Sequence, residues 1–289
     1  MASMRDIKRR KSSIQGTQQI TKAMKLVSTV KLQRARAGAE RSKDYFTCMY
    51  DTVNSILKRV GHVEHRYLNH RSEGKKAVIV ITSNRGLAGG YNTNVAKLVT
   101  RNPEFPAEET LVYTLGNKGR EIFMRQGYEV RDCGGEIVEN PAYSDAMALS
   151  ARVLKAYEEG EVNQIFLAYT SFKNTVSHIP TMLKLLPVDV SSVKEENNET
   201  EGPSAVMDFE PEDVEALDLI IPKYMTSLIY GALMEAVASE NGARMQAMDN
   251  ATSNAEEMIS DLSLKYNRAR QSSITQELTE IIAGAEAIG

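Results

Sequence analysis

The two ends of the chain carry helix-forming sequences of opposite charge, and this limits the possible folds more than any other feature. Residues 1–36 hold ten Lys or Arg and one acid, whereas residues 212–289 hold thirteen acids and five bases. No proline interrupts 1–57 or 223–289. Helices of that length cannot bury an apolar stripe on a compact core, so we expect the two ends to pair with each other. The intervening chain would then fold as an inserted domain.

The N-terminal segment predicts one helix from about Met4 to Lys58, with a thin and partly polar seam at heptad spacing. The seam residues are Ile7, Ile14, Thr21 and Ser28, with Thr17, Met24 and Lys31 in the companion positions. In the C-terminal segment, Pro222 predicts a kink or a restart, followed by a helix of about 65 residues. The narrow stripe of that helix comprises Ala251, Ala255, Met258, Leu262, Tyr266 and Ala269.

The middle of the chain alternates between two patterns. Short β-branched runs at 75–82, 111–115 and 164–170 predict buried strands, and the segments 91–101, 117–126 and 143–159 predict helices. Strands alternating with helices indicate a mostly parallel, Rossmann-like α/β domain. We therefore expect an N-terminal coiled-coil helix over 1–60, an inserted α/β domain over 75–192 and a C-terminal coiled-coil helix over 209–289.

A glycine-rich loop, Ser83–Asn92, follows the first predicted strand and has two interpretations. Such loops bind phosphates in nucleotide-binding domains. They also occur as tight turns, in which glycine supplies a positive φ or allows close packing. The glycine spacing fits neither the dinucleotide pattern nor the P-loop pattern, so we favour a tight turn and expect no cofactor.

Other candidates for chemistry are weak. His62, His65 and His70 lie close together, but no cysteine or paired acids stand at ligand spacing, which favours a solvated linker over a metal site. The two cysteines, Cys48 and Cys133, indicate a reducing cytosol. The basic N-terminal helix has its charges spread around it and has no aromatic residue before Tyr45, which argues against nucleic-acid or membrane binding. We expect no catalytic residues and no resident metal.

Three stretches of the chain resemble the γ subunit family of F-type ATP synthases. They are IQGTQQITKAMKLVSTVKLQRAR at 14–36, TSNRGLAGGYNTN at 82–94, and SENGARMQAMDNATSNA at 239–255 followed by LKYNRARQSSITQELTEIIAGAEAI at 264–288. The last of these is long and ordered, which makes it the most specific. The cysteine-containing regulatory insertion of the chloroplast version is missing, so thiol control is not implied.

The resemblance implies an antiparallel, left-handed coiled coil inside an α3β3 hexamer. The α/β domain would form a foot with the ε subunit on the c-ring, at the cytoplasmic face of the membrane. Such a subunit is present once per complex, is not catalytic alone, and transmits rotation to the three β subunits. It contacts no nucleic acid, and it meets the membrane only through the complex.

The resemblance also implies roles for individual residues. Those facing the α and β subunits would be Arg9, Arg10, Met24, Lys25, Arg270, Gln271, Thr275, Gln276 and Glu277. Met24 and Lys25 match the part that faces an acidic lever segment of β, although Met24 also fits the seam. Arg270 and Gln271 match a polar catch for β loops, and the tip at 278–288 would run in an apolar sleeve. Asp208, Phe209 and Glu210 match the foot region near the c-ring and ε.

An alternative of a different class is a nucleotide-binding α/β enzyme with a coiled-coil dimerisation arm. The uneven seams argue against it, since an arm built for symmetric dimers carries matched seam residues. Micromolar ATP binding by the isolated chain would favour this alternative.

Overall fold

The computed structural model describes residues 4–60, 65–69, 74–188 and 213–286. Two long helices, α1 (Met4–Val60) and α7 (Asp213–Glu286), lie at the two ends of the sequence. The chain divides into two compact units, one of residues 1–29 and 244–289 and the other of residues 30–243. Each long helix therefore contributes to both units. The boundaries predicted for the domains stay predictions.

The larger unit contains a five-stranded sheet with the order β3-β2-β1-β4-β5. Its strands are β1 (Lys75–Ile81), β2 (Thr110–Leu115), β3 (Glu129–Asp132), β4 (Val162–Phe172) and β5 (His178–Leu186). The first four are parallel, and β5 runs antiparallel to β4. The predicted mostly parallel α/β fold is confirmed.

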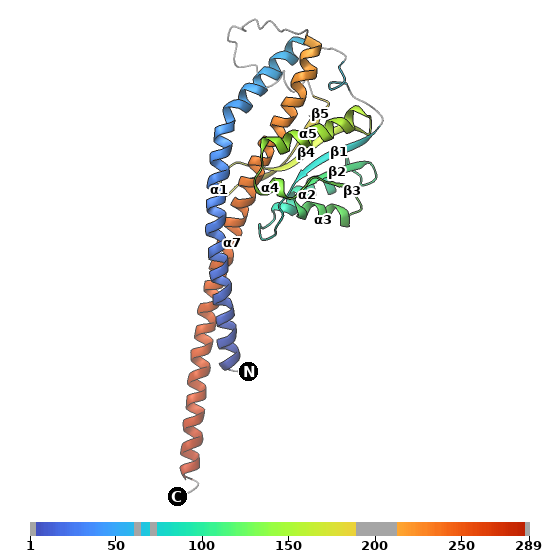
Figure 1. Ribbon diagram of the computed structural model, residues 1–289. Helices are drawn as coiled ribbons and strands as arrows, with labels where there is room; N and C mark the ends of the chain where they lie inside the picture. Colours follow the sequence, from blue (N-terminus) through green and yellow to red (C-terminus); the bar gives the residue numbers. More distant parts are fainter. Residues whose placement is uncertain (1–3, 61–64, 70–73, 189–212, 287–289) are drawn as a thin grey trace. The chain divides into compact units, whose positions relative to one another are not determined.

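The helices α2 (Tyr91–Thr100), α3 (Asn117–Arg125) and α5 (Tyr143–Glu158) match the three helices predicted between strands, and α4 (Glu136–Glu139) is a single added turn (Figure 1). The two edge strands were not predicted. β3 has only four residues, none of them buried. β5 contains Pro180 and is mostly half-buried, so neither strand has the continuous apolar run of a central strand.

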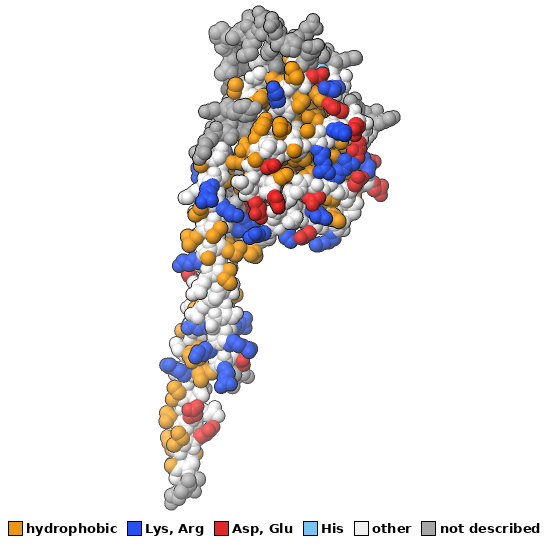
Figure 2. Space-filling model, viewed as in Figure 1, with side chains coloured by type: hydrophobic (Ala, Val, Ile, Leu, Met, Phe, Trp, Pro, Cys, Tyr) orange, Lys and Arg blue, Asp and Glu red, His pale blue; other side chains and the backbone are white. Residues whose placement is uncertain are grey.

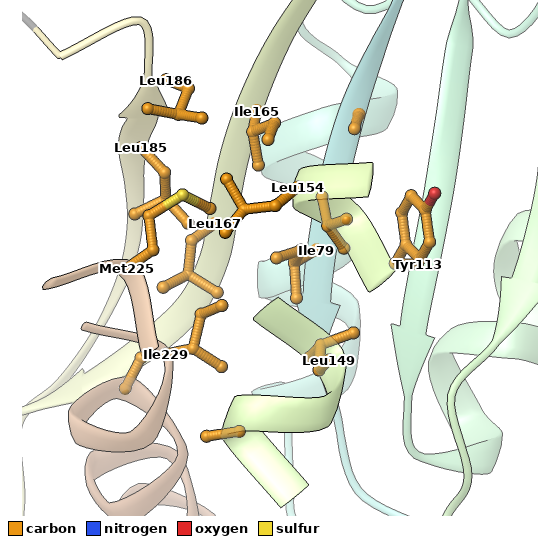
Figure 3. Packing of buried hydrophobic residues seen from close by; sticks show 14 of the residues in the cluster. Ile79, Tyr113, Leu149, Leu154, Ile165, Leu167, Leu185, Leu186, Met225 and Ile229 are labelled. Carbon is orange, nitrogen blue, oxygen red and sulfur yellow. The ribbon is translucent and has the colours of Figure 1, made fainter. Parts of the chain in front are cut away.

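One face of the sheet packs against α5 and the first part of α7. Figure 3 shows Met225 and Ile229 of α7 facing Leu167 of β4 and Leu185 of β5. All four side chains are buried. The other face packs against α2 and α3 through a second apolar cluster that includes Val95 and Phe123. The start of the C-terminal helix is therefore a layer of the α/β unit.

Pro222 lies inside α7, and the helix does not restart there, so the prediction of a restart is wrong. Proline lacks an N–H, and the carbonyl of Asp218 consequently has no intrahelical donor four residues later. Packing compensates for this loss, because Leu217, Ile221 and Met225 are fully buried on both sides of the proline. Tertiary burial thus outweighs the local preference of proline.

Candidate functional site

The smaller unit pairs the N-terminal part of α1 with the C-terminal part of α7. At its centre, the hydroxyl oxygens of Thr21 and Thr252 lie 2.8 Å apart. Both residues are buried, and the Thr252 hydroxyl also lies 2.8 Å from the carbonyl oxygen of Met248. The seam of this pair is therefore polar at a place where coiled coils usually bury aliphatic side chains.

Two polar contacts lie on either side of this threonine pair. Lys25 Nζ donates to Asp249 Oδ1 at 2.6 Å, and Gln18 Nε2 donates to Glu256 Oε1 at 3.0 Å. The partner number on α7 falls as the number on α1 rises, so the two segments are antiparallel. The basic end of the chain meets the acidic end as expected. Lys25, assigned above to a partner subunit, forms an ion pair within the chain.

The seam of α1 differs from the predicted one at its companion positions. Thr21 and Ser28 are buried as expected, but Thr17 and Lys31 are exposed. Met24 is half-buried, as expected for a companion residue. The further companion residues are Gln18 and Lys25, which are half-buried, and Leu32, which is buried. They follow the heptad residues by four rather than three, a spacing that also keeps side chains on one face of a helix.

The predicted stripe of α7 also needs one correction. Ala255 is buried, and Leu262, Tyr266 and Ala269 are half-buried, as expected. Met258, however, is 54% exposed. Ile259 is half-buried in its place. Seam positions on a coiled-coil helix alternate between steps of four and three residues, so Ala255 is followed by Ile259 and then by Leu262.

The residues assigned to partner subunits are mostly exposed. Those with exposed side chains are Arg9, Arg10, Arg270, Gln271, Thr275, Gln276 and Glu277. Met24 is half-buried, which fits a seam residue with one accessible side. Asp208, Phe209 and Glu210 lie outside the described residues. The roles of all these residues stay predictions.

The C-terminal end of α7 exposes a row of large apolar side chains. Ile274 is 49% exposed, Leu278 54%, Ile281 67% and Ile282 59%. Their spacing places them along one side of the helix. Figure 2 shows Lys and Arg gathered where α1 begins, and apolar and acidic side chains beyond them toward the C-terminus. An exposed apolar row is unusual on a free surface and marks a contact site.

The glycine-rich loop after β1 is closed by its own hydrogen bonds. Asn92 Oδ1 accepts from the backbone N–H of Ser83 at 2.9 Å, and Asn92 Nδ2 donates to Ser83 Oγ at 2.7 Å. Asn84 Nδ2 donates to the carbonyl of Gly135 at 2.6 Å, which joins the loop after β1 to the loop after β3. Ser83 and Asn92 therefore bind each other across the turn, and Asn84 joins the turn to a neighbouring loop, as a tight structural turn requires.

α7 lies next to the same edge of the sheet. Ligands of open parallel sheets bind at the carboxyl ends of strands where the strand order reverses, which here is between β1 and β4. At that place Tyr91 Oη donates to the carbonyl of Ala236 at 3.2 Å. At the end of β4, the N–H of Phe172 donates to Glu235 Oε2 at 3.2 Å. The usual ligand position is thus in contact with the chain's own helix.

The histidines do not form a metal site in the described part of the chain. His62 and His70 lie outside the described residues. His65 is buried, so the prediction of a solvated linker is wrong for this residue; its Nε2 lies 3.0 Å from Asp218 Oδ1. Among the described residues, no group of three or more His, Cys, Asp or Glu side chains is arranged to hold a metal ion.

His178 is half-buried at the start of β5, opposite Phe172 of β4. Its Nε2 lies so close to Gly242 of α7 that a Cβ at this glycine would be 2.5 Å away. Burial lowers the pKa of the His178 imidazole. The absence of a side chain at Gly242 therefore allows an uncharged ring to pack on the helix.

The fold places the protein among chains whose long terminal helices pair and whose middle forms a Rossmann-like domain. A family model described as ATP synthase matches residues 3–288. The chain belongs to the family of ATP synthase gamma chains. None of its described helices is long and apolar enough to span a membrane.

The relatives cover the whole chain. The ATP synthase gamma chain of Lachnoclostridium phytofermentans is 61% identical and covers 100% of both chains. The gamma chain of Acetobacterium woodii, described as sodium ion specific, is 38% identical and covers 99% of each. In structure, a chain of the Euglena gracilis mitochondrial ATP synthase (OSCP/F1/c-ring, rotational state 3) has a TM-score of 0.66 at 18% identity, covering 99% of this chain and 94% of that one.

Proposed function

We propose that this chain is the central rotor subunit of the F1 part of a proton- or sodium-translocating ATP synthase. It transmits rotation between the membrane c-ring and the three catalytic β subunits, and so links ATPase activity to ion flow. It has no active site of its own. Its partners are the α3β3 hexamer, the ε subunit and the c-ring, and one copy serves each complex at the cytoplasmic face of the membrane.

The observation that carries this proposal is the exposed end of α7 in a chain of the gamma family. Thr21 pairs with Thr252 and Gln18 with Glu256, so the start of α1 falls near residue 270 of α7 in this register. The exposed apolar row from Ile274 to Ile282 lies beyond that point. An apolar helix end that extends past the described start of α1 and stays exposed fits a sleeve supplied by other subunits.

The sides of the paired helices differ in chemistry, and this difference supports a rotor role. Arg9 and Arg10 are exposed on α1, whereas α7 exposes the apolar side chain of Leu264 at about the same level of the pair. A rotor inside a ring of three β subunits presents a different side to each of them. Each β then takes the conformation that binds its side best, so that turning the rotor shifts the three equilibria in sequence.

The assigned residues have defined parts in this proposal. Met24 and the N-terminal arginines meet the acidic lever of β. Arg270 and Gln271 form a polar catch, followed one turn later by Thr275, Gln276 and Glu277. Asp208, Phe209 and Glu210 belong to the foot on the c-ring and ε. Lys25 lies beside Met24 in the same proposed contact, and its ammonium group also pairs with Asp249 of α7.

Assembly with purified α and β subunits tests the proposal. The full chain should enter an α3β3 complex at one copy per hexamer and stimulate its ATPase activity. A variant with Ile274, Leu278 and Ile281 changed to Ser should assemble more weakly, because the sleeve contact loses apolar area. Failure of the unaltered chain to enter the hexamer would refute the assignment. Micromolar binding of ATP by the chain alone would favour the nucleotide-binding enzyme instead.

A further inference from the structure

The short segment of residues 65–69 forms a turn that contacts three elements of the α/β unit. The N–H groups of Leu68 and Asn69 both donate to the carbonyl of His65, at 3.0 and 3.1 Å. The carbonyl of Tyr67 accepts from the N–H of Val188, just after β5, at 3.1 Å. The turn is therefore fixed by its own backbone bonds and by the exit of the edge strand.

The side chain of Tyr67 holds this turn to the end of α5. It is 1% exposed, and its hydroxyl donates to Glu158 Oε1 at 2.6 Å. Its ring lies 6.3 Å from that of Tyr157. Burial, together with the bond to Glu158, raises the pKa of the Tyr67 hydroxyl. The phenol therefore stays protonated and donates throughout the physiological pH range.

His65 and Arg66 hold the same turn to α7. The Nδ1 of His65 accepts from the N–H of Tyr67 at 3.3 Å, which leaves the proton of a neutral ring on Nε2. That Nε2 then donates to Asp218 Oδ1 at 3.0 Å. Arg66 Nε donates to the same oxygen at 2.9 Å, and Arg66 also pairs with Glu158 at 3.4 Å. Two donors thus converge on one carboxylate of α7.

Asp218 lies at the point of α7 where a backbone hydrogen bond is missing. It is the residue four before Pro222, so its carbonyl is the one that the proline deprives of a donor. The helix thus lacks a backbone hydrogen bond at the same residue whose carboxylate accepts hydrogen bonds from His65 and Arg66. These side-chain bonds compensate for the missing backbone hydrogen bond.

We propose that His65, Arg66 and Tyr67, with Asp218 and Glu158, form a clamp that braces α7 across the gap at Pro222. The clamp makes the first turns of α7 move together with the α/β domain. On the rotor assignment proposed above, it is a positioning device, because torque entering at the foot must pass along α7 without loss at the proline.

Hydrogen exchange on the full chain tests the clamp without any other subunit. In Asp218→Ala, the amides of residues 216–221 should exchange at least about tenfold faster, because the buried His65 N–H and the Arg66 guanidinium lose their acceptor. Asp218→Asn keeps an acceptor oxygen and should show a smaller change. Lys223→Ala, at an exposed neighbouring position, is the matched control and should leave exchange unchanged.

The decisive variant adds Pro222→Ala to Asp218→Ala. If the clamp braces the proline gap, the restored backbone bond should return exchange most of the way to the unaltered rate. Unchanged exchange in Asp218→Ala, or no rescue by Pro222→Ala, would overturn the proposal. Should Asp218→Ala fail to fold, Arg66→Ala removes the more exposed contact and is tested with the same rescue.

In the assembled ATP synthase, Asp218→Ala should lower the number of ions moved per ATP hydrolysed while hydrolysis itself continues. Pro222→Ala should restore that ratio. A clamp that fails in the exchange experiment leaves the rotor assignment intact, because that assignment is tested by assembly with α and β.

Discussion

The hydroxyl groups of Thr21 on α1 and Thr252 on α7 lie 2.8 Å apart in the buried centre of the paired helices. A polar pair at this position contributes less stability than two aliphatic side chains, but it favours one register over its neighbours. A rotor needs a fixed register, because a shift of one residue on either helix would present different side chains to its partners.

A double-mutant cycle on this pair should be non-additive. Thr21→Val and Thr252→Val alone should each lower the free energy of unfolding by about 1 kcal/mol, because the remaining buried hydroxyl keeps only its backbone carbonyl as a partner. The double variant should be close to neutral or more stable, since both polar groups are removed together. Urea unfolding of the full chain measures this, with exposed Thr275→Val as the control. Additive losses would show that the two hydroxyls are not coupled.

Replacing half-buried Met24 by Lys should slow coupled rotation without unfolding the chain. An added cation facing an acidic lever of β introduces an attraction of roughly 1–3 kcal/mol if partly desolvated, and less if solvated. The measurement compares ATP hydrolysis and ion pumping in the assembled enzyme. Met258→Lys, at an exposed position of α7, serves as the control. Normal hydrolysis together with normal pumping would make Met24 a seam residue only.

Changing Arg270 and Gln271 to Ala should impair ATP synthesis more than it destabilises the chain. Both side chains are exposed, so their removal from the free chain costs little. In the complex, each charge-assisted or polar bond to a β loop should contribute about 1.5–3 kcal/mol. Synthesis rates and unfolding curves are compared with those of Lys265→Ala, whose side chain pairs with Asp261 on the same helix. Wild-type synthesis in the double variant would refute the catch.

Stability should fall as the pH falls through the range of histidine titration. Burial lowers the pKa of His178 in the folded chain, so the unfolded chain binds the proton more readily. Stability from this group is therefore complete above the unfolded pKa of about 6.5, and it is lost as the pH drops toward the lower folded value. Unfolding at pH 8 and pH 5 should differ more for the native chain than for His178→Gln. Equal pH dependence would contradict this role.

Local sequence patterns were sufficient for the regular elements of the fold. The buried runs of β1, β2 and β4 and the three intervening helices were predicted because their apolar periodicity is strong. β3 and β5 are edge strands whose side chains are partly solvated, so their sequences lack that signal. The seam of α1 was predicted correctly at Thr21, Met24 and Ser28. It was displaced by one residue at Thr17 and Lys31, since spacings of three and four residues both occupy one helix face.

Contacts between residues far apart in the sequence could not be predicted from local sequence patterns. The pairing of His65 with Asp218 joins positions 153 residues apart, and nothing near either residue signals the other. The same holds for Tyr91 and Ala236, which place α7 beside the ligand edge of the sheet. The site residues were predicted from the resemblance to a family. Their exposure depends on the register in which α1 pairs with α7, and the sequence of one helix alone does not specify that register.

Rotation of this chain inside a hexamer is tested most directly by single-molecule measurement. A bead fixed to the α/β domain is followed while surface-bound α3β3 hydrolyses ATP. We expect stepwise rotation in one direction, with a longer pause at one angle when Arg270 and Gln271 are both changed to Ala. A bead that stays still while the same complexes hydrolyse ATP would contradict it.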